Sequence, residues 1–321
     1  GHAVYFESHQ CIACGALLGF DPGELEMRSL TESNGFLSDE DGRRYLACTN
    51  GTEYGVCNWL RSSDDTHTLC LGCRFNRTIP DLSKPINLLR WGKFETSKKR
   101  LLYTLLRLGL PLSNGFDDPR NGLLLDFIED SRSDPYQFPE TFSTTGYLGG
   151  IITVNALEAD DAAREAMRVE MGESYRTVLG HLRHESGHYY WSLFDAGPKE
   201  IEVFKGLFGD LFEDYSSALR RYYAEGPRED WAGQYISAYA SSHPIEDWAE
   251  SWGHYMHIYD VLETAAALGV TGSQPDDYDV RESISTWSRL SVTLNELNRS
   301  IGLGDAYPFV VTAAVEEKLV Y

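Results

Sequence analysis

The sequence predicts an α+β chain with a small cysteine-rich domain, residues 1–80, and a larger, mainly helical domain with a small β-sheet, residues 81–321. All six cysteines lie between positions 11 and 73, in a stretch that lacks long helical periodicity. Beyond residue 90, apolar residues recur mostly at helical spacing, apart from two short apolar segments that are typical of strands. A chain of 321 residues is long enough for both domains.

The composition limits the classes of function. The hydrophobic content of 42% and the charged content of 24% are typical of a globular protein. A net charge of −21 argues against binding to nucleic acid or to an anionic membrane, because both need a basic surface. No apolar run approaches the ~20 residues of a membrane-spanning helix, and the first residues lack the pattern of a signal peptide. We therefore expect a cytoplasmic protein that binds neither nucleic acid nor membranes.

Four of the six cysteines form two C-x-x-C pairs, and the other two lie between these pairs. In chain order they are Cys11, Cys14, Cys48, Cys57, Cys70 and Cys73. Without a visible export signal, clustered C-x-x-C pairs indicate thiolate metal sites in a reducing compartment and not a disulfide framework. Such a site, commonly a zinc site, stabilises a segment that is too small to build a core. Buried free thiols are the alternative interpretation.

The elements of the larger domain follow from periodicity and from turn residues. Two prolines indicate a linker over residues 78–90. A helix is expected over 91–110, with Lys98, Lys99 and Arg100 on its polar side. Strands are expected over 123–129 and 148–155. The remaining helices are expected over residues 160–171, 174–194 (with Ser174 as N-cap), 200–208, 211–225, 228–240, 244–268, 280–300 and 309–319.

The helix predicted over residues 174–194 carries the segment His184-Glu185-Ser186-Gly187-His188. Histidines four positions apart project from the same face of a helix, so both imidazoles can reach one metal ion. Glu185 lies one position round the helix, where a carboxylate can accept a proton from a zinc-bound water. The apolar flanks indicate a buried helix, in which these polar side chains are costly unless a partner such as zinc binds them. Two histidines without a metal are the alternative interpretation.

A zinc ion that catalyses hydrolysis needs a third protein ligand and an open position for water. Three acids lie near the start of the helix predicted over 244–268, namely Glu246, Asp247 and Glu250. Glu246 and Glu250 share one helix face, where two acids repel unless they have different partners. We expect Glu246 to bind the metal and Glu250 to accept the free ring N–H of a ligating histidine. Glu250 or Asp247 is the alternative ligand.

Six segments of the chain carry a resemblance to known sequences, namely CNWL at 57–60, LCLGCRFNRTIPDLS at 69–83, KRLLYTLLRLGLP at 99–111, GHLRHESGHYYW at 180–191, LFGDLFEDYSSAL at 207–219 and SAYASSHPIEDWAESWGHYMH at 237–257. Taken together, they resemble a family of zinc-binding metallopeptidases in which a zinc ribbon precedes a gluzincin-type peptidase domain. The resemblance implies a zincin-like fold for the larger domain, and a cytoplasmic bacterial protein with peptidase activity. It implies no particular substrate.

A more distant resemblance concerns lethal-factor-like gluzincins, which have a tyrosine seven residues before the glutamate ligand and another glutamate four residues after it. Tyr239, Glu246 and Glu250 have this spacing. The resemblance implies that the Tyr239 hydroxyl stabilises the oxyanion of the reaction, a role that suits a positioned O–H donor. Core packing is the alternative for a residue that is one of 19 tyrosines.

The family resemblance also bears on the cysteines. In the arrangement that we favour, the last four cysteines bind one zinc ion, and Cys11 and Cys14 are half of a second site. In an interleaved arrangement, Cys11 and Cys14 share a zinc ion with Cys70 and Cys73. We therefore expect one catalytic zinc ion and one or two structural zinc ions.

These features together predict a zinc metallopeptidase that hydrolyses an amide bond of a peptide or protein substrate. In this prediction Glu185 is the general base, and Tyr239 stabilises the oxyanion. A binding protein is the rival prediction, in which the zinc ribbon recognises a protein partner and the helical domain is an inactive or self-processing peptidase scaffold. The two functions are compatible within one chain.

Overall fold

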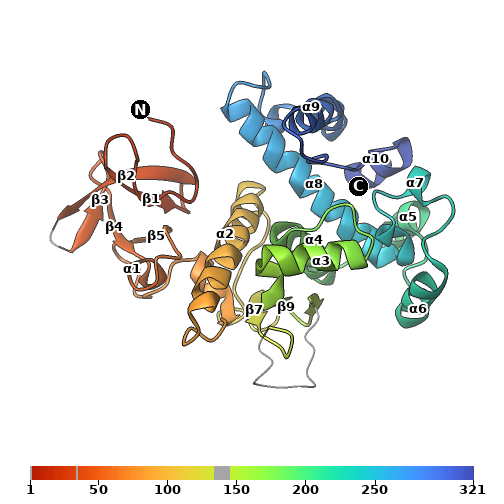
Figure 1. Cartoon of the computed structure of the whole chain (residues 1–321), viewed down its shortest axis with the longest axis horizontal. Coiled ribbons are helices and arrows are strands. Elements are labelled where there is room, and N and C mark those ends of the chain that lie inside the picture. The colour runs from red at the N-terminus through yellow and green to blue at the C-terminus, as the bar shows by residue number, and fades with distance from the viewer. Residues whose placement is uncertain (1, 34, 134–144) are drawn as a thin grey trace. The chain divides into compact units, whose positions relative to one another are not determined.

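The computed structural model describes residues 2–33, 35–133 and 145–321, and the chain divides between residues 166 and 167 into two units. Figure 1 labels the elements of each unit. Helices and two small sheets account for the regular structure of the described residues, which confirms the predicted α+β class. The domain boundary predicted at residue 80 falls inside the first unit, between the strand β6 (Asn76–Thr78) and the helix α2 (Pro85–Arg107).

An antiparallel sheet of five short strands forms the N-terminal part of the first unit (Figure 1). Leu30, Tyr45 and Leu60 form one buried apolar cluster of this sheet, and the buried Phe20 of the first strand packs on the buried ring of Trp59. The strands are adjacent in chain order: β1 (Leu17–Asp21), β2 (Glu26–Ser33), β3 (Phe36–Ser38), β4 (Arg44–Ala47) and β5 (Leu60–Ser62).

A long helix and a four-stranded sheet make up much of the remaining first unit. Phe94 of α2 stacks on Phe127 of the sheet, with 4.6 Å between the ring centroids. The strand order is β6-β7-β9-β8, in which β6, β7 and β9 are parallel and β8 is antiparallel to β9. The two predicted strands correspond to β7 and β9, and the helix predicted over 160–171 corresponds to α3. These elements are β7 (Leu124–Ile128), β8 (Gly146–Leu148), β9 (Ile151–Asn155) and α3 (Asp161–Glu170).

Helices form the second unit, and the longest of them is α8 (Pro244–Ala267) (Figure 1). It packs against helices that precede it and helices that follow it along the chain. They are α4 (Val178–Leu193), α5 (Pro198–Phe208), α9 (Val280–Ser300) and α10 (Ala313–Val320). A further helix, α6 (Tyr215–Glu225), packs on the short 3-10 helix η3 (Tyr239–Ser242) that precedes α8.

Several predicted helix boundaries were wrong, and the structure shows the reason for three of them. The helix α2 begins at Pro85, inside the predicted linker, because proline suits the first turn of a helix. The helix α4 begins after Thr177, not Ser174, because the Thr177 hydroxyl accepts a hydrogen bond from the amide of Gly180 at 2.9 Å. The helix predicted over 228–240 is broken into α7 (Trp231–Gln234) and η3. Ser237 lies at the break, and its hydroxyl accepts a hydrogen bond from the amide of Ala240.

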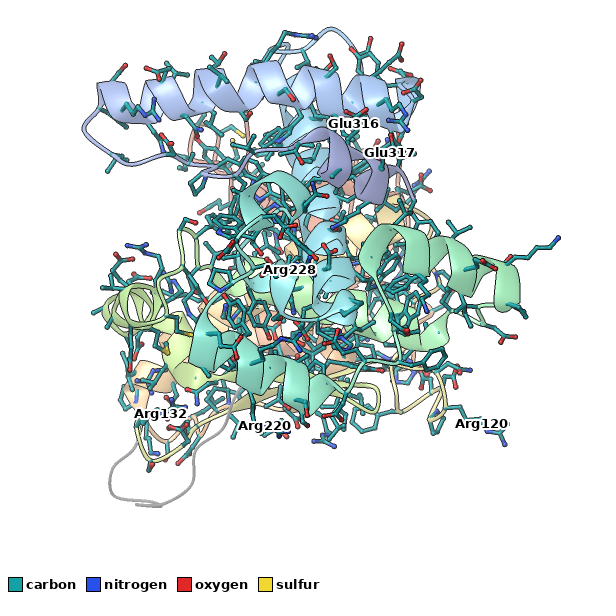
Figure 2. The ribbon with its side chains drawn as sticks, turned by 90° about the vertical axis from the view of Figure 1, so that its right-hand side faces the viewer. Arg120, Arg132, Arg220, Arg228, Glu316 and Glu317 are labelled. Carbon is teal, nitrogen blue, oxygen red and sulfur yellow. The ribbon has the colours of Figure 1, made fainter. Side chains whose placement is uncertain are left out.

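The core of the second unit lies between α8, α9, α10 and η3, and includes Ile258, Trp287 and Tyr307. At the surface, the Arg281 guanidinium of α9 bonds to Glu316 and Glu317 of α10, whose side chains Figure 2 labels. Among the described residues, no helix has both the length and the apolar composition that are needed to cross a membrane.

Two histidines on α8 are held in this core as neutral side chains. Nδ1 of His254 lies 2.8 Å from the hydroxyl of Tyr307, and the His257 ring lies 5.0 Å from the Tyr307 ring. Burial lowers the pKa of His254 to about 4, although the charge of Glu250 opposes this shift. Burial, together with the charge of Arg183, lowers the pKa of His257 to about 3. The folded chain therefore accommodates both side chains more favourably as neutral imidazoles than as cations.

We predict that acid destabilises the second unit through these two histidines. Their pKa values are lower in the folded chain than the ordinary value of about 6.5, so the unfolded chain binds more protons below that pH. The stabilising effect is complete above about pH 6.5 and is lost as the pH falls toward 4, by roughly 1 kcal/mol per pH unit for each histidine. Urea unfolding between pH 7.5 and pH 4.5 measures this slope. A His254→Gln, His257→Gln double variant should flatten it, and an unchanged slope in that variant would contradict the assignment.

Candidate metal centre and active site

The helices α4 and α8 cross in close contact at Gly187. A Cβ atom at this position would lie 3.0 Å from Cα of Ala249 and 3.2 Å from Cβ of Trp252, closer than ordinary packing allows. Two indole N–H groups fix the crossing further, because Trp248 donates to the carbonyl of Gly187 and Trp252 donates to the hydroxyl of Ser186. The crossing therefore brings the first turns of α8 against the middle of α4, where the two histidines lie.

Three of the predicted ligands converge at this crossing. Nε2 of His184 lies 3.2 Å from Nε2 of His188, and the Glu246 oxygens lie 3.1 Å and 3.5 Å from these two nitrogens. Ligands around a tetrahedral zinc ion with bonds of about 2.0–2.1 Å are separated by roughly 3.3 Å. The two imidazoles keep 15% and 16% of their side-chain surface exposed, whereas the Glu246 side chain keeps 2%. The three donors thus fit one zinc ion that solvent can reach.

The electrostatics of these residues also suit a bound cation. Oε2 of Glu246 is buried and has no hydrogen-bond donor in suitable geometry among the described residues. Burial alone would raise the pKa of Glu246, but interaction with His184 and His188 holds that pKa well below its ordinary value. A buried carboxylate that stays ionised beside two imidazole nitrogens is a typical zinc ligand set.

Glu250 lies behind His184, on the side away from the other ligands. Its Oε1 lies 2.7 Å from Nδ1 of His184, and its Oε2 accepts a hydrogen bond from the Ser237 hydroxyl at 2.6 Å. Burial alone would raise the pKa of Glu250, but bonding with His184 lowers it to about 2. The carboxylate therefore stays charged and fixes Nε2 of His184 as the ring nitrogen that faces the metal position.

Asp247, the remaining alternative ligand, points to a different part of the unit. Its Oδ2 lies 2.5 Å from Nζ of Lys318 on α10, and neither residue is exposed by more than 7%. The geometry brings Glu246 and not Asp247 to the two histidines. Asp247 instead ties the C-terminal helix to the start of α8.

The proposed general base and the phenol predicted from the sequence both lie at this site. Glu185 is 8% exposed, and its negative charge acts on His184 and on Tyr215. The Tyr239 ring lies 6.1 Å from the His184 ring, between centroids. Tyr215 was not among the predicted site residues, yet its hydroxyl donates a hydrogen bond to Oε1 of Glu246 at 2.9 Å. A contact between residues 31 positions apart leaves no periodic pattern that could reveal it.

The last four cysteines form a second donor cluster, in the first unit. Cys48, Cys57, Cys70 and Cys73 are buried, and their sulfur atoms all lie within 4.8 Å of one another. The sulfurs of Cys57 and Cys70 are 3.6 Å apart, close to the roughly 3.8 Å expected for two ligands of a tetrahedral zinc ion with bonds of about 2.3 Å. This cluster corresponds to the sequential arrangement of the cysteines.

Cys11 and Cys14 are not part of this cluster. They form a turn in which the amide of Gly15 donates to the carbonyl of Cys11, and Gly15 has a φ of +75°, which favours glycine. Cys11 is buried and Cys14 is exposed, and the described residues bring no third ligand to them. The structure therefore places them apart from the other four thiols. None of the six cysteines forms a disulfide.

Two lysines of α2 supply positive charge beside the cysteine cluster. Lys98 and Lys99, predicted on a polar surface, are 0% and 4% exposed, so that prediction was wrong. Lys98 bonds to the buried carboxylate of Glu95, whose Oε2 lies 3.5 Å from the sulfur of Cys73. Burial alone would lower the pKa of Lys99, but the negative charge of Cys57 and Glu95 raises it. Helical spacing alone cannot show that a cation faces buried thiolates.

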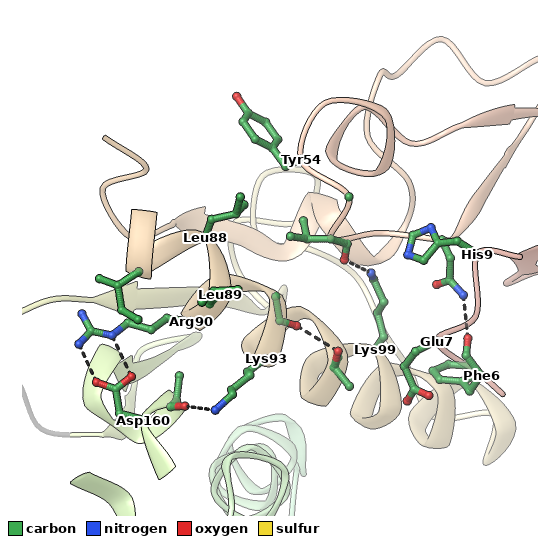
Figure 3. Close-up of a pocket in the computed structure, with 17 residues that line it drawn as sticks. Phe6, Glu7, His9, Tyr54, Leu88, Leu89, Arg90, Lys93, Lys99 and Asp160 are labelled. Atoms are coloured by element: carbon green, nitrogen blue, oxygen red, sulfur yellow. Dashed lines mark hydrogen bonds and ion pairs between the residues drawn. The ribbon is translucent and has the colours of Figure 1, made fainter. Parts of the chain in front are cut away.

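A groove of about 590 Å³ lies in the first unit, between the N-terminal segment and α2 (Figure 3). Tyr54, Leu88 and Leu89 expose apolar surface along it. Its cations are already paired, since Arg90 bonds to Asp160 and Lys99 bonds to the carbonyl of Val56. The groove holds an apolar surface but no cluster of catalytic or metal-binding side chains among the residues that the structure describes.

Comparison with known proteins agrees with both clusters. Residues 87–321 match the family described as "Putative zinc-binding metallo-peptidase", and residues 1–84 match a zinc-ribbon domain. The chain therefore belongs to this family of zinc-binding metallopeptidases, with a zinc ribbon at its N-terminal end. It is 37% identical over 329 residues to proteins of Mycobacterium bovis and Mycobacterium tuberculosis that carry the name "Uncharacterized protein", with 99% of this chain and 91% of each relative covered. No solved structure matches the chain.

We predict that the two clusters bind zinc independently. The purified chain should contain about two zinc ions, one in each cluster, because each offers a complete ligand set. His184→Ala should lose one ion and Cys70→Ser the other, as measured by elemental analysis of the desalted protein. Circular dichroism checks that each variant is folded. A His184→Ala protein with the zinc content of the wild type would contradict the assignment of His184.

We also predict that Glu250 raises the zinc affinity of the histidine site, which consists of His184, His188 and Glu246. Glu250→Ala removes the carboxylate that orients His184, and such changes typically weaken metal binding by roughly 10–100-fold. Competition with a zinc chelator measures the affinity. Glu296→Ala, which removes the same charge from an exposed position on α9, is the matched control. Equal affinities in the two variants would show that Glu250 has no such role.

Proposed function

We propose that the chain is a zinc-dependent peptidase of the gluzincin type, with His184, His188 and Glu246 as ligands of the catalytic ion. The observation that supports this most is the convergence of the three donor atoms beside Glu185, with both imidazoles partly exposed to solvent. A helix that supplies two ligands and a base, together with a carboxylate from a second helix, is an arrangement that suits metal-assisted hydrolysis. The family to which the chain belongs supports the same class of reaction.

The residues of the site divide the chemistry between them. Zinc, when bound, would polarise a water molecule and the scissile carbonyl. The Glu185 carboxylate takes the proton of the attacking water and passes it to the leaving amine. Glu250 holds the tautomer of His184 through Nδ1. We infer that Tyr239 contributes to the hydrogen bonding that stabilises the negative charge on the carbonyl oxygen, since its ring lies against His184.

We further propose that the four clustered cysteines bind a structural zinc ion in a domain that covers residues 1–80, and that residues 81–321 form the peptidase domain. Cys11 and Cys14 are half of a further site in this proposal. A closed four-thiolate site leaves no position for water, so its ion has no role in catalysis. Six free thiols are consistent with a reducing, cytoplasmic location.

A protein-binding role of the ribbon is the second candidate function. The observation that favours it is the groove beside α2, where Tyr54 and Leu89 are 41% and 66% exposed. Exposed apolar side chains that line one groove are typical of a protein-binding surface. This role is compatible with a peptidase, and it becomes the main candidate if the histidine site has no activity.

We predict that Glu185→Gln abolishes hydrolysis and leaves zinc bound. The variant keeps the size of the side chain but cannot take a proton from water, so the rate should fall by roughly 10²–10⁴-fold. Cleavage of a broad fluorogenic peptide library by the zinc-loaded chain measures the rate, and elemental analysis measures the zinc. Glu225→Gln, at the exposed end of α6, is the matched control.

The outcomes separate the two candidate functions. Cleavage by the wild type and by Glu225→Gln, but not by Glu185→Gln, supports the peptidase. A wild-type chain that binds zinc at His184 and cleaves no member of the library supports the protein-binding role. Equal cleavage by all three proteins would show that a contaminating protease causes the activity.

A further inference from the structure

The hydroxyl of Tyr215 lies beside the proposed metal ligands, although Tyr215 belongs to a separate helix. It donates a hydrogen bond to Oε1 of Glu246 at 2.9 Å, and this oxygen lies 3.5 Å from Nε2 of His188. Tyr215 is 43% exposed, whereas Glu246 is 1% exposed. The phenol therefore lies at the boundary between the buried ligands and solvent, which is where a substrate carbonyl would approach.

Contacts of its neighbours fix the position of Tyr215. It is the first residue of α6, and the Asp214 side chain caps this helix by accepting a hydrogen bond from the amide of Ser217 at 2.9 Å. His243 then links α6 to α8. Its Nδ1 accepts a hydrogen bond from the amide of Ile245, so Nε2 carries the ring proton and donates to the carbonyl of Glu213 at 3.0 Å.

The same histidine acts at the start of both helices. The ring of His243 packs edge-on against the ring of Tyr215, with 5.2 Å between centroids. His243 is also the N-cap of α8, the helix that carries Glu246 in its first turn. One buried side chain therefore fixes the Tyr215 phenol and the Glu246 carboxylate relative to each other. Side chains that act in binding or catalysis need this kind of support from their neighbours.

Tyr239 is a neighbour of this phenol and of the metal ligands. It interacts with Tyr215, and its ring lies 6.1 Å from the His184 ring, between centroids, whereas Tyr215 itself donates the hydrogen bond to Glu246. Because Tyr215 is the phenol that bonds to Glu246, we place Tyr215 next to the reacting atoms and Tyr239 behind it.

We propose that Tyr215 is a catalytic residue of this site, and that its O–H group leaves Glu246 to donate a hydrogen bond to the carbonyl oxygen of the substrate as negative charge develops there. Tyr239 and His243 are positioning residues for this phenol. No proton leaves Tyr215, and the proton of the attacking water still passes through Glu185. The proposal rests on the proposed peptidase function and adds a residue to it.

The test uses a probe that does not depend on turnover. Acetohydroxamate binds an open metal position through two oxygens and changes the visible spectrum of a Co²⁺-substituted site, whereas the four-thiolate site has no open position. Titration of the full Co²⁺-loaded chain gives the affinity for acetohydroxamate. Tyr215→Phe should weaken this affinity by roughly 10-fold, because a hydrogen bond to a charged oxygen is lost.

Two further variants show whether the effect belongs to Tyr215. Tyr239→Phe should cause a smaller loss, and Tyr223→Phe, which alters a more exposed tyrosine on the same helix, should cause none. The Co²⁺ affinity of each variant is measured separately, so that a loss of metal is not mistaken for a loss of the donor. With a cleavable peptide, Tyr215→Phe should lower kcat by roughly 10²–10³-fold.

The outcomes for Tyr215 and for the peptidase are distinguishable. A Tyr215→Phe chain that binds acetohydroxamate as tightly as the wild type overturns the proposal, and so does a larger loss in Tyr239→Phe than in Tyr215→Phe. A wild-type chain that binds the probe in a Tyr215-dependent way but cleaves no peptide overturns the peptidase function and supports the placement of Tyr215.

Discussion

The close crossing of α4 and α8 is the constraint on which the histidine site depends. With no Cβ at Gly187, the two helices approach so closely that Ala249 lies against the backbone of α4. Glu246 and Glu250 flank Ala249 along α8, and this spacing allows one to face the metal position and the other to hold His184 from behind. A larger residue at Gly187 would separate the helices and move every donor at once, because packed helices transmit a displacement as rigid bodies.

Much of the histidine site could be predicted because it depends on the spacing of residues within single helices. Histidines four positions apart on one helix have only one way to share a face, and two acids on the facing helix need separate partners. Those rules led to Glu246 as the candidate ligand and to Glu250 as the partner of a ligating histidine, and the structure shows that this histidine is His184. They could not lead to Tyr215 or His243, whose contacts depend on how η3, α6 and α8 meet in space. Such contacts become visible only when the chain is folded.

The fold was harder to predict where elements are short or where two residues serve equally well. Strands of three residues, such as β3 and β5, are too short to show alternation, so the sheet of the ribbon left little signal. Ser174 and Thr177 are both good N-caps, and periodicity does not decide between positions less than one turn apart. Lys98 and Lys99 resemble a solvated face in the sequence because the segments that bury them lie far away along the chain, where Lys98 bonds to Asn76 and Lys99 to the carbonyl of Val56.

The buried lysines have a consequence for how this chain can be divided. The zinc-ribbon match ends at residue 84 and the peptidase match begins at residue 87, which suggests a natural place to separate two modules. The contacts contradict that impression. Glu95, Lys98 and Lys99 belong to the peptidase side of this junction, yet they are buried against Cys73 and Val56 of the ribbon. Removal of the ribbon would expose these three charged side chains of α2, and it would remove the ring of Tyr54 from the buried Trp91. The boundary between the two family matches therefore differs from the boundary of the compact unit, which ends at residue 166. The helix α2 depends on the ribbon for part of its packing.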